Sequence, residues 1–199
     1  MLKSCMYHNL IEAGCDEAGR GCLAGPVVAA AVILPKNFRH PVLNDSKQLS
    51  AKTRIILRDE IINSAIAWNV AFVNNEEIDE MNILRASIKA MHLALDGLKR
   101  TPQFIIVDGN SFYPYKNIGH KTVIKGDSKY FSIAAASVLA KTFRDEFMEK
   151  IHIEHPEYGW NRNKGYATAF HRLAIRQHGI TPYHRKSFTL LDTQLDFDF

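Results

Sequence analysis

Apolar positions along the chain fall into short unbroken runs and into longer stretches with a helical period. Unbroken runs predict strands covered on both faces, whereas recurrence every three or four residues predicts amphipathic helices. We expect strands at about 10–16, 27–35, 65–73, 103–108 and 120–125. We expect helices at about 51–63, 76–99, 131–151 and 167–178, the first of them capped by Ser50. Strands that come first and then alternate with helices indicate an α/β fold with a mixed sheet.

Length and composition favour one domain. The 199 residues contain no linker rich in Pro, Gly or Ser and no internal repeat. We expect the domain to span residues 1–190, with a helical C-terminal part from about 150 to 190. The acidic and aromatic segment 191–199 is expected to form a tail.

Two other classes of protein are excluded at this stage. The longest apolar run, Val27 to Pro35, has nine residues, whereas a membrane-spanning helix needs about 20. The first ten residues lack the apolar core of a signal peptide. The three cysteines, Cys5, Cys15 and Cys22, form no C-x-x-C pair and indicate reduced thiols. We therefore expect a cytoplasmic protein.

Positive charge is concentrated in the second half of the chain. The net charge of +4 combines a balanced stretch, 1–112, with residues 113–190, which hold 13 Lys and Arg against 6 Asp and Glu. This asymmetry favours a polyanionic partner such as nucleic acid. A solvated basic surface gives the same count and stays open as an alternative.

Carboxylates stand where three expected strands end, at Asp16 and Glu17, at Asp108 and at Asp127. Strand ends border the ligand crevice in open α/β sheets, and carboxylates gathered there need cations to neutralise them. Two hard divalent ions about 4 Å apart would clamp a phosphodiester and activate water. Each acid alone also fits an ordinary turn. Because neighbours on a strand face opposite sides, Asp16 and Glu17 share a site only if the strand ends or bulges there.

The motif D-E-A-G-R-G-C-L-A-G-P-V-V at 16–28 resembles bacterial ribonuclease HII, a family of ribonuclease H-like nucleases. The resemblance runs from about 10 to 188 through N-D-S-K-Q-L at 44–49, V-D-G-N at 107–110, K-G-D-S at 125–128, S-I-A-A-A-S-V-L-A-K-T-F-R-D at 132–145, N-K-G-Y-A-T at 163–168 and H-R-K-S-F at 184–188. It implies a mixed five-stranded sheet flanked by helices, with a small C-terminal helical extension. The implied activity is endonucleolytic hydrolysis of RNA in RNA–DNA hybrids and at single ribonucleotides in duplex DNA, with 5′-phosphate and 3′-hydroxyl ends.

The same resemblance assigns the carboxylates a role. Asp16, Glu17, Asp108 and Asp127 match the catalytic, metal-binding acids of the family. Two Mg²⁺ or Mn²⁺ ions are implied as cofactors.

Substrate contacts are implied in the same way. The loop Gly19, Arg20 and Gly21 matches the one that grips the ribose 2′-hydroxyl, and Tyr166 matches the tyrosine that stacks on the next sugar. Glycine allows a sugar to approach the backbone closely. Without the resemblance, Tyr166 fits a core position. Basic residues near the motifs are candidates for phosphate contacts or plain surface charges, namely Lys47, Lys125, Lys141, Arg144, Lys164, Arg185 and Lys186.

The last six residues resemble the short peptides by which bacterial proteins dock on the replication sliding clamp. Gln194, Leu195, Phe197 and Phe199 would make the contacts, with Phe197 in place of the usual Leu. The alternative is that the tail packs back on the domain.

Several rival hypotheses remain at the level of sequence. The sister family ribonuclease HIII usually carries an extra N-terminal domain, whereas about ten residues precede the first expected strand here. A recombination nuclease that cuts branched DNA shares the expected fold. A catalytically silent hybrid-binding module would require loss of a carboxylate, and all four are present. A dinucleotide site is disfavoured because G-x-G-x-x-x-G is one residue too long. Zinc is disfavoured because His152 and His155 lack cysteine partners and His171 and His178 are seven residues apart. We expect these histidines to be solvated or to face nucleic acid. We expect a monomer.

Overall fold

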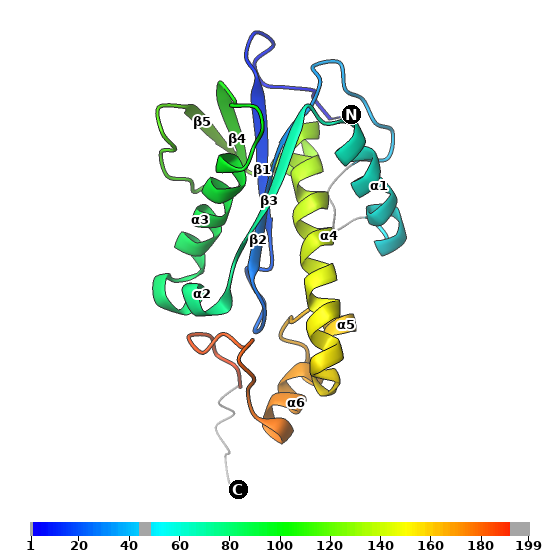
Figure 1. Ribbon diagram of the computed structural model, residues 1–199, viewed down its shortest axis with the longest axis vertical. Helices are drawn as coiled ribbons and strands as arrows, with labels where there is room; N and C mark the ends of the chain where they lie inside the picture. Colours follow the sequence, from blue (N-terminus) through cyan, green and yellow to red (C-terminus); the bar gives the residue numbers. More distant parts are fainter. Residues whose placement is uncertain (1, 44–48, 192–199) are drawn as a thin grey trace, which may run out of the picture.

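A mixed five-stranded sheet forms the centre of the structure, a computed structural model that describes residues 2–43 and 49–191 (Figure 1). The strand order is β3-β2-β1-β4-β5. The strands are β1 (Glu12–Ala18), β2 (Val27–Ile33), β3 (Ala67–Val73), β4 (Phe104–Asp108) and β5 (Gly119–Val123). β2 pairs antiparallel with β1 and β3, whereas β1, β4 and β5 run parallel. The expected α/β fold with a mixed sheet is therefore confirmed.

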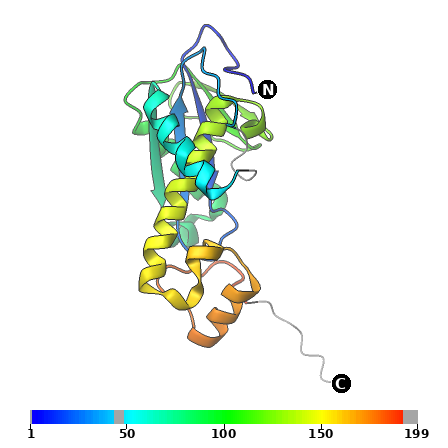
Figure 2. The same ribbon diagram turned by 90° about the vertical axis from the view of Figure 1, so that its right-hand side faces the viewer.

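Helices cover both faces of this sheet (Figures 1 and 2). They are α1 (Ala51–Ser64), α2 (Asn75–Met81), α3 (Ile83–Asp96), α4 (Phe131–Glu154), α5 (Trp160–Asn163) and α6 (Ala169–His178). β2 is buried along its whole length because its alternate residues pack in two different cores. Val27 and Ala29 join α3 in one core, whereas Ala30 and Val32 join α1 and α4 in the other.

The single helix expected over 76–99 is wrong, because the chain forms α2 and α3 with a break at Asn82. Asn82 has a φ of 71°, and its side chain accepts hydrogen bonds from the backbone N–H groups of Leu84 and Arg85. This cap starts a new helix. The apolar period conceals the break because Ile78 and the apolar residues of α3 pack in the same core.

The other expected elements are confirmed with small shifts of their ends. α1 begins after Ser50, whose side chain accepts a hydrogen bond from the N–H of Thr53. Three short elements were not expected from the sequence, because they are too short to show a period. These are α5 and the 3₁₀ turns η2 (Gly126–Ser128) and η3 (Pro156–Tyr158).

The C-terminal elements pack around the last turns of α4 and form a third core (Figure 2). Trp160 and Tyr158 fill its centre, and Leu23 and Ala24 reach into it from the loop that follows β1. Within the described ranges, no helix combines the length and the apolar character that crossing a membrane requires.

Candidate active site

Three parallel strands bring the predicted acids to one edge of the sheet. β1 and β4 are in register at Cys15 and Val107, where their pairing ends, so the next residues, Asp16 and Asp108, lie side by side on neighbouring strands. β5 pairs with β4 at Asp108 and then leads into η2, which carries Asp127. Carboxyl ends of parallel strands form ligand crevices in α/β folds.

β1 stays regular beyond the two acids that it carries. Glu17 pairs with Ala29 and Ala18 with Val28 on β2, so β1 neither ends nor bulges at the two acids. The sequence led us to expect such an end or bulge if Asp16 and Glu17 share one site. Asp16 and Glu17 therefore point to opposite sides of the strand. Asp16 lies against α4 and accepts a hydrogen bond from the side chain of Ser137. The pairing of β1 with β4 ends at Cys15, which leaves both acids at the open edge.

The carboxylates influence one another strongly. Burial, followed by the nearby charges of Glu17 and Asp108, raises the pKa of Asp16 well above its usual range. Burial also raises the pKa of Glu17, although the ion pair with Arg20, at 3.1 Å between Nη1 and Oε1, opposes the shift. The other oxygen, Glu17 Oε2, is buried without a hydrogen-bond partner. Such a cluster favours a cation, because a cation would reduce the repulsion between the carboxylates and would coordinate the oxygen that lacks a hydrogen-bond partner.

Asp108 and Asp127 are joined through the turn between β5 and α4. The backbone N–H of Gly126 donates to Asp108 Oδ1 at 2.6 Å. Asp127 follows directly in η2 and is only 4% exposed. In the part of the chain that the structure describes, no three His, Cys, Asp or Glu side chains converge closely enough to enclose a metal ion. The acids thus share one edge of the sheet without forming a closed cage.

The loop after β1 places its two predicted glycines in different environments. Gly19 is buried and has a φ of +96°, where an L side chain is strained. Gly21 is exposed, and a Cβ there would meet no atom within 4 Å. Arg20 is exposed between them and pairs with Glu17. The fold therefore requires glycine at position 19 but not at position 21.

Tyr166 lies beside this loop, on the surface. Its residue forms an isolated antiparallel bridge with Cys22, and 43% of it is exposed. The Lys141 ammonium lies 5.8 Å from the centre of its ring. Lys141 is itself held by Asp145 at 2.7 Å. The core position that Tyr166 would otherwise fit is therefore wrong.

Two arginines expected to contact phosphates are buried instead. Arg144 and Arg185 are both 0% exposed, and backbone carbonyl groups accept hydrogen bonds from each guanidinium. A phosphate cannot reach them in this arrangement. The sequence does not reveal this burial because arginine is almost always found at the surface unless paired.

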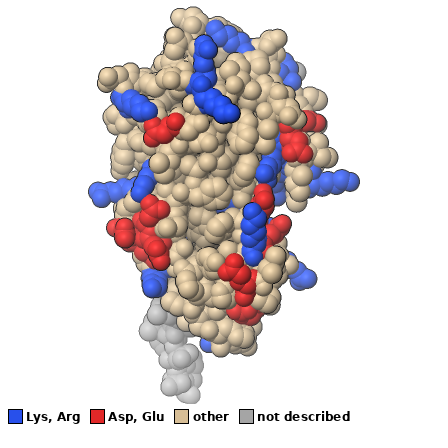
Figure 3. Space-filling model, in the orientation of Figure 1, with Lys and Arg blue, Asp and Glu red and all other residues tan. Residues whose placement is uncertain are grey.

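The other basic candidates stay at or near the surface. Lys125 and Lys186 are exposed, and Lys164 pairs with Glu149 at 2.7 Å. Acidic and basic side chains alternate around the visible face, which carries no continuous basic patch (Figure 3). Lys47 and the tail residues Gln194, Leu195, Phe197 and Phe199 lie outside the described residues.

His171 is fully buried, so the expectation that it is solvated or faces nucleic acid is wrong. The backbone N–H of Thr181 donates to His184 Nδ1 at 2.9 Å, which leaves the proton of His184 on Nε2. Trp160 Nε1 donates to His171 Nε2 at 3.0 Å, and His184 Nε2 lies 3.2 Å from the same nitrogen. His171 Nδ1 then carries a proton and donates to the carbonyl oxygen of Tyr166 at 3.0 Å. A chain of neutral histidines thus supports the backbone of Tyr166.

Ser137 is a site residue that sequence reasoning missed. It lies on α4 four residues before Lys141, so both point to the same side of the helix. Its hydroxyl reaches Asp16, and Lys141 reaches the ring of Tyr166. Its place in the apolar stretch 131–140 of α4, where Ser132 is the other polar residue, was the available signal.

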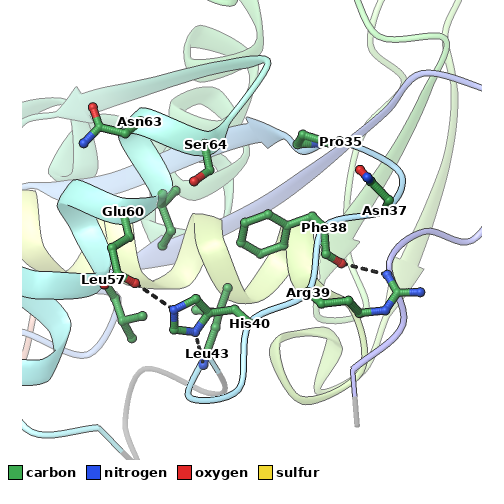
Figure 4. Close-up of a pocket in the computed structure, with 11 residues that line it drawn as sticks. Pro35, Asn37, Phe38, Arg39, His40, Leu43, Leu57, Glu60, Asn63 and Ser64 are labelled. Atoms are coloured by element: carbon green, nitrogen blue, oxygen red, sulfur yellow. Dashed lines mark hydrogen bonds and ion pairs between the residues drawn. The ribbon is translucent and has the colours of Figure 1, made fainter.

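A separate pocket lies between α1 and the segment that follows β2 (Figure 4). Its volume is about 560 Å³. Its carboxylate, Glu60, is paired with His40 at 2.7 Å, and His40 Nδ1 accepts from the backbone N–H of Leu43. The pocket contains none of the four predicted acids.

Comparison with known proteins adds to this geometry. The profile of the family Ribonuclease HII matches residues 13–191. Ribonuclease HII of Bacteroides thetaiotaomicron is 60% identical over 200 residues, which covers 100% of both chains. Ribonuclease HII of Christiangramia forsetii is 64% identical over 191 residues, 96% of each chain.

Two solved structures are similar in fold and sequence. The ribonuclease H2 of Pyrococcus horikoshii OT3 superposes with a TM-score of 0.76 at 30% identity and covers 90% of this chain and 94% of that one. The RNase HII of Archaeoglobus fulgidus, solved in a complex with PCNA, superposes with a TM-score of 0.79 at 28% identity, over 94% and 99%.

The sheet order and the helices on its two faces, together with these superpositions, define a ribonuclease H-like nuclease. The profile match and the identity over full-length relatives go further, and the chain belongs to the ribonuclease HII family. It is an endonuclease of the ribonuclease H type, which acts on RNA–DNA hybrids. The resemblance noted in the sequence is confirmed.

Proposed function

We propose that the chain cuts at ribonucleotides, including single ones embedded in duplex DNA, by hydrolysis assisted by two divalent cations, and leaves 5′-phosphate and 3′-hydroxyl ends. The observation that carries the proposal is the continuity of β1 with the loop after it. Asp16 and Glu17 lie near the end of β1, and Gly19, Arg20 and Gly21 follow after Ala18, the last residue of the strand. The group that tests the sugar thus lies next to the acids that serve the phosphate.

The proposed cation ligands are Asp16, Glu17, Asp108 and Asp127. Support comes from the buried oxygen Glu17 Oε2, which lacks a partner, and from the repulsion that raises the pKa of Asp16. Asp108 accepts a hydrogen bond from the Gly126 amide at Oδ1, and its Oδ2 is the oxygen that would contact a cation. Oxygen donors of this kind suit Mg²⁺ or Mn²⁺. When bound, the cations supply Lewis acidity to the phosphodiester.

The chain's own residues orient the substrate. Gly21 presents open backbone to the ribose, whose 2′-hydroxyl distinguishes RNA from DNA. Tyr166 offers its exposed ring to the sugar of the next deoxynucleotide. Arg20 pairs with Glu17, and its guanidinium would be available to a phosphate if Glu17 held a cation. Lys125, Lys141, Lys164 and Lys186 are proposed to contact phosphates, which positions the duplex.

Cleavage of matched duplexes tests the proposal. Wild type and Asp108→Asn are assayed on an all-RNA hybrid, a duplex with one ribonucleotide, an all-DNA duplex and a branched DNA. We expect wild type to cut only the first two, and Asp108→Asn to bind but not cut. Cutting of branched DNA without cutting at the ribonucleotide would contradict the proposal. Binding of hybrid without cleavage by wild type would favour a silent binding module.

In the cell, we propose that the chain works as a cytoplasmic monomer that removes ribonucleotides from DNA during replication and repair. A second proposal concerns the tail, in which Gln194, Leu195, Phe197 and Phe199 would dock on the bacterial sliding clamp. Its support is the RNase HII of Archaeoglobus fulgidus, which was solved with PCNA. Deletion of residues 194–199 is expected to abolish clamp capture while hybrid cleavage persists. Unchanged capture would contradict docking and favour a tail that packs on the domain.

A further inference from the structure

Arg185 bridges the two ends of the loop that follows β1. It is fully buried in the segment after α6. All three of its nitrogens donate to loop carbonyl oxygens, Nη2 to Gly19 at 2.7 Å, Nη1 to Arg20 at 2.9 Å and Nε to Gly25 at 3.0 Å. One rigid side chain thus holds both the start and the end of the loop.

Arg144 connects the same loop to the Tyr166 segment. Its Nη2 donates to the carbonyl of Ala24 at 3.1 Å, its Nε to Pro26 at 2.9 Å and its Nη1 to Lys164 at 2.8 Å. Lys164 stands two residues before Tyr166. Arg144 is also fully buried.

Backbone hydrogen bonds complete the connection. The N–H of Leu23 donates to the carbonyl of Gly165 at 2.7 Å, and the N–H of Arg185 donates to the carbonyl of Leu23 at 2.8 Å. The N–H of Gly25 donates to the carbonyl of Tyr183 at 2.9 Å. The loop is therefore hydrogen-bonded to two C-terminal segments, one at Gly165 and the other at Tyr183 and Arg185.

We propose that Arg144 and Arg185 are positioning residues that fix the Gly19–Gly21 loop relative to Tyr166, so that the ribose site is formed before substrate binds. This inference rests on the proposed recognition of ribonucleotides by that loop. In this proposal the C-terminal extension contributes to substrate recognition, because it carries Tyr166 and because its Arg185 donates hydrogen bonds to the loop. A site held in advance loses less conformational freedom when substrate binds.

We call the hydrogen bonds from Arg144 and Arg185 to the loop carbonyl groups the clamp; it is distinct from the replication sliding clamp. The geometry of these bonds requires arginine. A guanidinium presents five N–H donors in a planar fork, whereas a lysine presents a single ammonium on a flexible stem. No lysine can therefore reach carbonyl oxygens at Gly19, Arg20 and Gly25 at once. The result of Arg→Lys is a loop that keeps a buried cation and loses its fixed geometry.

Binding titrations of Arg185→Lys and Arg144→Lys test the clamp. Each protein is titrated, by fluorescence anisotropy at fixed salt, with a duplex carrying one ribonucleotide and with an all-DNA duplex of the same sequence. Ca²⁺ replaces Mg²⁺, and a gel verifies that the duplexes stay intact. We expect the ratio of the two affinities to fall by about tenfold or more, because small misplacements of a positioning group have effects of this size or larger. A purely structural role would lower the melting temperature and leave the ratio unchanged.

Arg172→Lys is the matched control. Arg172 lies in the same extension and donates to the carbonyls of Thr189 and Leu190. Its variant is expected to keep the wild-type ratio. An unchanged ratio in folded Arg185→Lys and Arg144→Lys would overturn the clamp. Absence of any ribonucleotide preference in wild type would instead overturn the proposed function.

Amide hydrogen exchange on wild type tests the clamp without any variant. The amides of Leu23, Gly25 and Arg185 are expected to exchange slowly, as core amides do, whereas the exposed Gly21 amide exchanges fast. This measurement decides the matter if the variants fail to fold or if wild type shows no preference. Unprotected Leu23 and Gly25 amides would show that the loop is not held and would overturn the clamp.

Discussion

The backbone of Gly19 packs directly on the guanidinium of Arg144. A Cβ built on Gly19 would overlap the Nε and Cδ atoms of Arg144. Gly21, two residues further on, faces open space. The two glycines of this short motif therefore differ in what requires them. Packing inside the protein requires glycine at position 19, whereas any requirement at position 21 comes from a molecule that binds to the surface.

Alanine substitution separates these two reasons. Gly19→Ala is expected to lower the free energy of unfolding by about 2 kcal/mol or more, because it adds both strain and overlap. Gly21→Ala is expected to leave that free energy within about 0.5 kcal/mol, as surface substitutions do, yet to reduce cleavage at a single ribonucleotide. Urea unfolding and cleavage rates measure the two effects. Equal stability loss in both variants would refute the distinction.

Cation binding is expected to stabilise the wild type through the acids of the site. At a free Mg²⁺ or Mn²⁺ concentration ten times its dissociation constant, the free energy of unfolding rises by about 1.4 kcal/mol. Asp108→Asn is expected to lose most of this gain. Without cations the variant should be at least as stable as wild type, since it no longer repels Asp16 and Glu17. Thermal melts with and without cation measure both effects, and an equal gain in the variant speaks against Asp108 as a ligand.

The buried histidine pair predicts loss of stability in acid. Burial, followed by the neighbouring His171, lowers the pKa of His184 to about 4, and burial lowers the pKa of His171 as well. The unfolded chain, with a histidine pKa near 6.5, binds these protons first, so stability is complete above that pH and falls as the pH drops toward 4. The loss is on the order of 2–3 kcal/mol for His184. Urea melts between pH 8 and 5 measure it.

Two variants serve as comparisons for this pH dependence. His184→Asn is expected to be less stable at pH 8 and to show a shallower fall toward pH 5. His178→Asn removes an exposed histidine from the same helix as His171 and is expected to reproduce the wild-type profile. A wild-type profile that is flat between pH 7 and 5 would contradict the neutral pair.

The break between α2 and α3 is expected to depend on the side chain of Asn82. Asn82→Ala removes the cap and leaves a Cβ at a positive φ, so we expect a loss of about 1–2 kcal/mol in the free energy of unfolding. Asn82→Gly is expected to be less damaging, because glycine tolerates that φ. Denaturant melts distinguish the two, and equal losses would mean that φ does not matter there.

Most of the sheet could be predicted from the sequence, because a strand that is buried on both faces consists almost entirely of apolar residues. β2 is apolar throughout, since it is covered on both faces. The break at Asn82 was missed because two helices on one core keep a shared apolar period. An asparagine inside such a period was a signal for a cap, but polar residues inside helices are common.

Asp108 and Asp127 could be placed from the sequence, because Asp108 ends the recognisable strand β4 and Asp127 lies in the turn between β5 and α4. The interior roles of Arg144 and His171 could not, since the sequence does not show that the C-terminal extension folds over the β1 loop. Burial of a charged or polar side chain depends on partners that are distant in the chain, and Arg185 reaches carbonyls more than 150 residues away.

α4 spans the whole arrangement. Ser137 reaches the acid Asp16, Lys141 reaches Tyr166, and Arg144 lies under Gly19, all on one side of a single helix. The side chains proposed to serve hydrolysis and those proposed to recognise the sugar are thus held by one helix. Inserting or deleting one residue between Ser137 and Arg144 would rotate one half of α4 by about 100° relative to the other half. We therefore expect an insertion or deletion there to separate the two groups of side chains, which a substitution would leave together.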